Sequence, residues 1–192
     1  MIRQNHARSR VLLPLVGLLS LLLCLSVQPA LAAGFVVSKA ADTNDGTCNA
    51  DCSLREAITA ANAAASADTI TFAAGANGTI TLGSPLPVLA NNGTLTITGN
   101  GAANTVVNGN GLGRVLEVAS GATVTISGVK IAGGLRNGAD GGGVLNNGTL
   151  TVASSTISGN LASNGGGIFN NGTLTVTSSV LSGNYAIFGN GG

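Results

Sequence analysis

Apolar and polar residues alternate in short stretches along residues 141–192, and the pattern repeats. The segments 141–164 and 165–188 align without gaps, and 16 of their 24 positions are identical. In each copy a Thr-Leu-Thr-Val stretch alternates with a period of two, which predicts a strand with one buried face. Self-similarity at such a fixed period is typical of solenoids. The repeat therefore predicts a stack of similar coils.

Each coil is expected to contain three short strands separated by turns. In the first copy the strands are residues 144–145, 149–152 and 156–158. Asn-Gly, Ser-Ser and Gly-Asn pairs between them form turns and tolerate positive φ. Parallel crossovers are nearly always right-handed. The prediction is an all-β fold, a right-handed parallel β-helix.

The earlier coils are less regular. Further short strands are expected at residues 70–72, 79–82 and 86–89. Thr-rich strands like those of the repeat begin at Thr94, Thr123, Thr149 and Thr173. Successive starts lie 29, 26 and 24 residues apart, so the coil length converges on 24. Residues 76–192 are therefore predicted to form the β-helix.

A third copy of the repeat begins at Gly189, and the sequence ends at Gly192. The coil 165–188 would then present an uncharged aliphatic edge, and unprotected edges pair with other chains. We expect either that the natural protein continues beyond Gly192 or that copies of the chain associate end to end.

One helix, residues 53–65, is predicted ahead of the coils. Ser53 and Glu56 have the spacing of a capping box, in which each side chain binds a backbone N–H of the first turn. Leu54 and Ile58 lie on the apolar face of this helix. We expect them to pack on the first coil, so that the helix covers the N-terminal end of the solenoid.

Residues 1–32 are predicted to be a secretory signal, with a basic start, a Leu-rich run and a small-x-small cleavage site before Ala33. An uncleaved membrane anchor is the alternative; no span is expected in the mature chain. Cys48 and Cys52 are the two cysteines after the signal, and export favours a disulfide between them. Zinc is a weaker alternative, because the mature chain has no His to complete four ligands.

Charge and composition limit the chemistry. Only 8% of the 192 residues are charged, and the mature part has five basic and seven acidic residues, hence a net charge of −2. No basic patch indicates nucleic-acid binding. The predicted mature part has no His, since His6 lies in the signal, and this excludes Ser-His-Asp and His-metal sites there. A calcium loop at residues 42–46 is a weak alternative to a plain Asx turn. We expect no metal and no cofactor.

Polysaccharide-active enzymes work with clustered carboxylates and a basic residue. The charged residues that match this need are Glu117 with Arg114, and Asp140 with Arg136 and Lys130. Arg114 and Glu117 are three positions apart, which on a strand puts them on opposite faces, although a bend nearby would change this. Because no two carboxylates share a strand face, these residues are expected to be solvated, and no catalytic residue is predicted.

Four of the predicted strands carry a Thr-x-Thr pair with both hydroxyls on the outward face. The pairs are Thr94/Thr96, Thr123/Thr125, Thr149/Thr151 and Thr173/Thr175. Stacked in register, they would form two columns about 6.6 Å apart with rungs about 4.8 Å apart. Such arrays resemble the ice-binding face of some β-solenoid antifreeze proteins, although Thr is also simply a good outward strand residue.

The segment around the helix resembles the CSLREA domain, found near the N-termini of secreted or surface right-handed β-helix proteins. The matching residues are Asp42 to Gly46, Cys48, the CSLREAI stretch 52–58, Ala61-Asn62 and 68–72. The GGGVLNN and GGGIFNN coils also resemble repeats of bacterial polymorphic outer-membrane proteins and pectin-lyase-like helices. The resemblance implies an exported, bacterial, surface-associated β-helix whose N-terminal cap is residues 33–75.

Together these patterns predict a noncatalytic, secreted or cell-surface β-helix. It would act as a structural or adhesive scaffold for a surface protein or a glycan. Two alternatives remain. The chain is the N-terminal part of a polysaccharide lyase or hydrolase whose catalytic coils lie beyond Gly192, or it is a Thr-array binder of ice.

Overall fold

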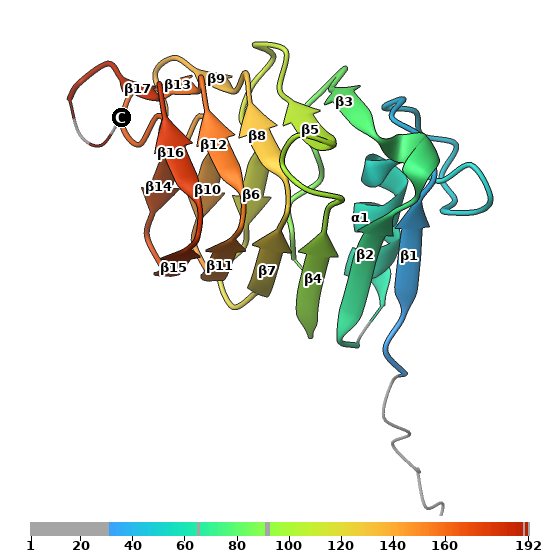
Figure 1. The fold of residues 1–192 in the computed structure, drawn as a ribbon. Coiled ribbons are helices and arrows are strands. Elements are labelled where there is room, and N and C mark those ends of the chain that lie inside the picture. The colour runs from blue at the N-terminus through green and yellow to red at the C-terminus, as the bar shows by residue number, and fades with distance from the viewer. Residues whose placement is uncertain (1–30, 65, 91–92, 190, 192) are drawn as a thin grey trace, which may run out of the picture.

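The computed structural model describes residues 31–192, except residues 65, 91–92, 190 and 192. Residues 1–30 of the predicted signal lie outside this range. The described strands stack in parallel as a β-solenoid, with α1 (Leu54–Ala63) at the N-terminal end (Figure 1). The predicted parallel β-helix with one helix is confirmed.

The largest sheet holds six parallel strands, and we call it the Thr sheet. In spatial order these are β1 (Gly34–Val37), β2 (Asp68–Phe72), β4 (Thr94–Thr98), β7 (Thr123–Ser127), β11 (Thr149–Ala153) and β15 (Thr173–Thr177). Along it, Leu95, Val124 and Leu150 are aligned and buried. Their neighbours Ile97, Ile126 and Val152 form a second buried column. Period-two alternation thus builds the core as predicted.

Three smaller sheets complete the coils. The five-stranded sheet has β3 (Gly78–Thr81), β5 (Thr105–Asn108), β8 (Lys130–Ala132), β12 (Thr156–Ser158) and β16 (Val180–Ser182). A three-stranded sheet has β6 (Leu116–Val118), β10 (Val144–Asn146) and β14 (Ile168–Asn170). The fourth has β9 (Leu135–Arg136), β13 (Leu161–Ala162) and β17 (Tyr185–Ala186). The later coils thus carry a fourth strand of two residues, too short to show a periodicity in the sequence.

Two predicted elements differ in the structure. Residues 86–89 do not form a strand; only Leu89 pairs with the sheet, by one bridge to Val118. Pro87 lacks the N–H that a strand within a sheet needs. The helix ends at Ala63, two residues before its predicted end. A single 3-10 turn, η1 (Ala74–Ala76), follows β2.

Adjacent coils approach so closely at the Gly-Gly-Gly turn that side chains are excluded there. A Cβ atom on Gly143 would lie 2.5 Å from the carbonyl oxygen of Gly167 and 2.9 Å from the Asn160 amide nitrogen. On Gly142 it would lie 2.5 Å from the Leu161 carbonyl oxygen. These contacts explain why the run of glycines recurs in each repeat.

Polar side chains form ladders between coils. Asn160 is 1% exposed; its Oδ1 accepts from the Gly134 N–H at 2.9 Å, and its Nδ2 donates to the Asn184 Oδ1 at 3.0 Å. Asn146 likewise donates to Asn170, at 2.6 Å. Each buried amide thus finds partners in the neighbouring coil, which fixes the register of the stack.

The two ends of the described stack differ. At the N-terminal end α1 contacts β1 and β2, with Ile58 completely buried and Leu54 3% exposed (Figure 1). At the other end, apolar side chains of the last coil are exposed: Val176, Val180, Leu181 and Phe188. In the described stack the helix thus covers the first strands, and the last coil carries exposed apolar side chains.

Candidate functional site

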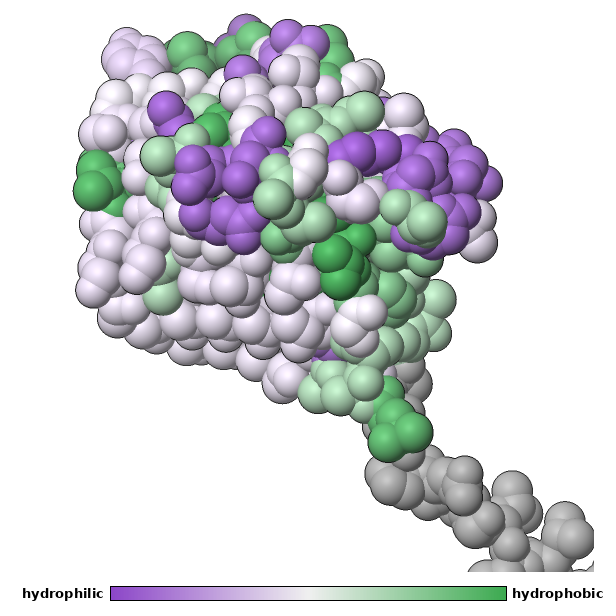
Figure 2. Space-filling view, turned by 45° about the vertical axis from the view of Figure 1, so that its right-hand side comes forward, coloured by the Kyte–Doolittle hydropathy of each residue, from purple (hydrophilic) through white to green (hydrophobic). Residues whose placement is uncertain are grey.

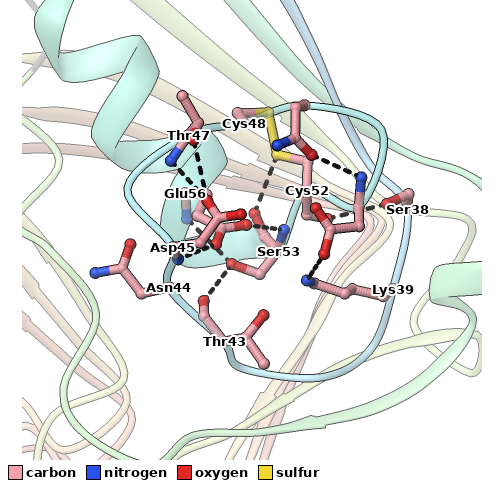
Figure 3. A network of polar contacts seen from close by, with 12 residues as sticks. Ser38, Lys39, Thr43, Asn44, Asp45, Thr47, Cys48, Cys52, Ser53 and Glu56 are labelled. Atoms are coloured by element: carbon pink, nitrogen blue, oxygen red, sulfur yellow. Dashed lines mark hydrogen bonds and ion pairs between the residues drawn. A yellow bond between two sulfur atoms is a disulfide. The ribbon is translucent and has the colours of Figure 1, made fainter.

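The capping box of α1 anchors a polar network in the N-terminal cap (Figure 3). The Ser53 Oγ accepts from the Glu56 N–H at 3.2 Å, and the Glu56 Oε2 accepts from the Ser53 N–H at 2.7 Å. The other Glu56 oxygen accepts from the Asp45 N–H at 2.7 Å. The Ser53 hydroxyl donates to the Thr43 carbonyl at 2.7 Å. Both side chains are buried, so this network fastens the loop to the helix.

Cys48 and Cys52 lie at disulfide distance within the same loop, with Cα atoms 4.5 Å apart (Figure 3). Cys52 is completely buried in the core, whereas Cys48 is partly buried and packs against the core. The link therefore ties the exposed loop to the start of the helix.

We predict that the chain from Ala33 onward contains no free thiol when it is produced under oxidising conditions. Closing a loop this short restrains the unfolded chain by about 2 kcal/mol, so the reduced form should also melt at a lower temperature. Thiol labelling in denaturant without reductant measures the first effect. Two labelled cysteines per chain would contradict the disulfide.

The loop at residues 42–46 uses its carboxylates for protein contacts. Both oxygens of Asp42 accept from Arg55, at 3.0 and 2.8 Å, and one also accepts from the Gly83 N–H. The backbone N–H of Thr47 binds Asp45 and lowers the pKa of that carboxyl. In the described part of the chain no three His, Cys, Asp or Glu residues cluster as metal ligands do. The contact from the Thr47 N–H to the Asp45 carboxylate, two residues earlier, is an Asx turn.

The Thr-x-Thr pairs lie on one sheet and in register. Thr94, Thr123, Thr149 and Thr173 form the first column. Thr96, Thr125, Thr151 and Thr175 form the second, which Thr69 of β2 extends. The first column is exposed and most of the second is half-buried. The structure therefore brings all eight predicted residues together on one outward face.

A third column of small side chains lies beside them, which the sequence analysis did not identify. It consists of Thr71, Thr98, Ser127, Ala153 and Thr177. Extending the alternation by one step beyond each Thr-x-Thr pair would have found it. We call the three columns the hydroxyl face.

Arg114, Glu117 and Arg136 lie around one pocket of about 180 Å³, here called the arginine pocket. Its other lining residues are Pro85, Leu86, Val88, Val115 and Leu116. Arg114 forms an ion pair with Glu117, so the two do not lie on opposite faces as they would on a continuous strand; the alternative of a nearby bend applies. Arg114 precedes β6, and strand alternation does not apply across the bend at Val115.

Arg114 is held by its neighbours. It donates to the backbone carbonyls of Gly141, at 3.1 Å, and Asp140, at 2.8 Å. Burial is the largest influence on the pKa of Arg114 and lowers it, and the positive charge of Arg136 acts in the same direction against the opposing effect of Glu117. The two arginines are thus close enough to repel each other.

The two remaining charged residues predicted from the sequence lie elsewhere. The Asp140 carboxylate accepts from the Asn164 amide at 2.8 Å and is not part of the pocket lining. Lys130 belongs to β8 in the five-stranded sheet, where it aligns with Thr156. The structure therefore places Arg114, Arg136 and Glu117 around the arginine pocket. Asp140 and Lys130 do not line this pocket.

No protein-family model, curated protein or solved structure matches this chain. The resemblance to the CSLREA domain therefore stays a prediction. Among the residues that the structure describes, no helix is both long and apolar enough to span a membrane. The function is argued from the sites themselves.

Proposed function

We propose that the protein is a noncatalytic, secreted or cell-surface β-helix, a structural or adhesive scaffold that binds a surface partner or a glycan. The hydroxyl face carries this proposal. Its columns stand in strict register over four successive strands, and each hydroxyl offers one donor and two acceptor lone pairs. A rigid, repeating row of hydroxyls suits a repeating polar ligand such as a polysaccharide.

The surface chemistry supports a weakly charged ligand for this face. Strongly hydrophilic residues gather in separate patches on the face in view, while pale residues of weak hydropathy cover much of the rest (Figure 2). In the hydroxyl face the residues are Thr and Ser apart from Ala153. Export and surface display follow from the predicted signal and are consistent with the Cys48–Cys52 pair.

Binding of the full chain to an array of bacterial and plant polysaccharides tests this proposal. The double substitution Thr125→Val and Thr151→Val removes two central hydroxyls while keeping side-chain shape and strand propensity. We expect it to weaken binding at least about tenfold, since each lost hydrogen bond is worth roughly 1 kcal/mol.

The matched control is Thr79→Val with Thr81→Val, both exposed on β3 of the other sheet. It should leave binding unchanged. Equal losses in the two double variants, or no loss in either, would contradict a role for the hydroxyl face.

The enzymatic alternative has weaker support. Glu117 is the one carboxylate among the residues that line the arginine pocket, and it is paired with Arg114. Glycoside hydrolysis generally uses two carboxyl groups across the scissile bond. Release of reducing ends from the polysaccharides of the array would favour this alternative over the scaffold.

Ice binding is the second candidate for the hydroxyl face, and the third column favours it by widening the regular array. The coils repeat about every 4.8 Å along the stack, as parallel strands do. Thermal hysteresis in solutions of the full chain measures this activity. If the full chain shows thermal hysteresis and the Thr125→Val, Thr151→Val variant does not, ice and not a glycan is the ligand of the hydroxyl face.

A further inference from the structure

We propose that the arginine pocket binds the carboxylate of an acidic sugar, with Arg136 as the residue that contacts it. The inference rests on the proposed function, because it takes the ligand from the glycan class. It concerns a site separate from the hydroxyl face: the pocket is bordered by β6 and β9 and lined by none of the Thr columns.

Arg136 is the unsatisfied member of the pocket. Its Nε is buried and has no hydrogen-bond partner, whereas Arg114 binds Glu117 and two backbone carbonyls. A buried donor of a charged group without an acceptor is unfavourable. Arg136 lines the pocket, and a rotation of its side chain that exposes Nε would let a bound carboxylate accept from Nε and a terminal nitrogen together, the paired geometry that guanidinium groups favour.

The position of Arg136 departs from the repeat. It aligns with Ala162 in the next coil, and Ala162 aligns in turn with Ala186. Both alanines are buried. The chain thus has a long, charged side chain at a position where the two later coils have alanine, and this side chain is half-buried at the pocket. The repeat does not require an arginine here, which is expected if the residue serves to bind a ligand.

The charges of the pocket select a monoanion. Two arginines and Glu117 give the lining residues a net charge of +1, which one carboxylate neutralises. A phosphate group carries more than one negative charge at neutral pH, about 1.5 to 2 in a monoester, and Glu117 would repel the additional charge. A singly charged carboxylate is therefore favoured.

The rest of the lining suits a sugar ring. Pro85, Leu86 and Val88 provide aliphatic surface for its C–H groups, and Glu117 is an acceptor for hydroxyls. The pocket volume of about 180 Å³ lies below the roughly 300–1,000 Å³ of sites for drug-sized ligands, so the pocket suits a single monosaccharide unit. A peptide carboxylate offers fewer hydroxyls to Glu117 and is the disfavoured source.

Titration of the full chain with glucuronate tests the proposal. Glucose, N-acetylglycine (a singly charged carboxylate without hydroxyls) and inorganic phosphate serve as comparison ligands. We expect glucuronate to bind at least about tenfold more tightly than each of them, and Arg136→Gln to weaken glucuronate binding by at least about tenfold. Lys130→Gln removes the same charge outside the pocket and should change nothing.

A spectroscopic measurement keeps the test valid if Arg136→Gln does not fold. The Nε–H resonance of Arg136 in the unaltered chain should shift on addition of glucuronate and not of glucose. Binding of glucose or N-acetylglycine as tight as that of glucuronate, an unmoved Nε–H resonance, or an adventitious response to phosphate alone would overturn the proposal.

The two proposals fail separately. If glucuronate does not bind but polysaccharide binding is lost in Thr125→Val, Thr151→Val, the pocket assignment is wrong and the scaffold function stands. If glucuronate binds through Arg136 while the threonine variant behaves like its control, the hydroxyl face is not the glycan surface.

Discussion

Ile58→Asp is expected to lower the free energy of unfolding by about 3–5 kcal/mol and to promote association of the protein. Ile58 is completely buried between α1 and the first strands, where α1 contacts β1 and β2. A carboxylate there would lose its hydration without gaining a partner. The cap would detach, and the apolar end of the solenoid would face water.

Urea unfolding followed by circular dichroism measures the stability change, and sedimentation measures association. The matched control is Thr59→Asp, which introduces the same carboxylate at the next, exposed position of the helix. It should cost less than about 1 kcal/mol. A stable monomer with Ile58→Asp would show that α1 is not needed to cover the end.

Asn160→Ala is expected to cost about 2–4 kcal/mol, the largest effect among the polar ladders. In the native structure the Asn160 Oδ1 accepts from the Gly134 N–H at 2.9 Å, and the Asn160 Nδ2 donates to the Ile131 carbonyl at 3.2 Å. The substitution removes both of these side-chain partners. Each buried group that loses its partner costs roughly 1–3 kcal/mol. The damage falls between coils, so cooperativity of unfolding should also decrease.

The control for this prediction is Asn147→Ala in the same coil. Asn147 is less buried, and its Oδ1 accepts from the Asn171 amide at 3.0 Å. We expect a loss below about 1 kcal/mol, measured in the same urea experiment. If the two variants lose equal stability, the burial of the Asn160 amide does not account for its contribution to the free energy of unfolding.

Some features of the fold are local and were predictable from the sequence. The first two columns of the hydroxyl face follow from alternation within each strand and from repeats that bring equivalent threonines of successive coils into register. The capping box of Ser53 and Glu56 needs only the first turn of a helix. The same local logic failed for residues 86–89, where Pro87 prevents sheet pairing.

The sequence by itself thus determined the solenoid, its Thr columns and its N-terminal cap, because each depends on a short periodic pattern. The tertiary structure alone decided the arginine pocket. Arg114 and Arg136 are far apart in sequence, and they meet because the coil between them returns to the same corner of the stack. The return of the chain to this corner also decides which donors find acceptors: the Nε of Arg136 is buried without a hydrogen-bond partner. The periodic pattern of the sequence does not show this.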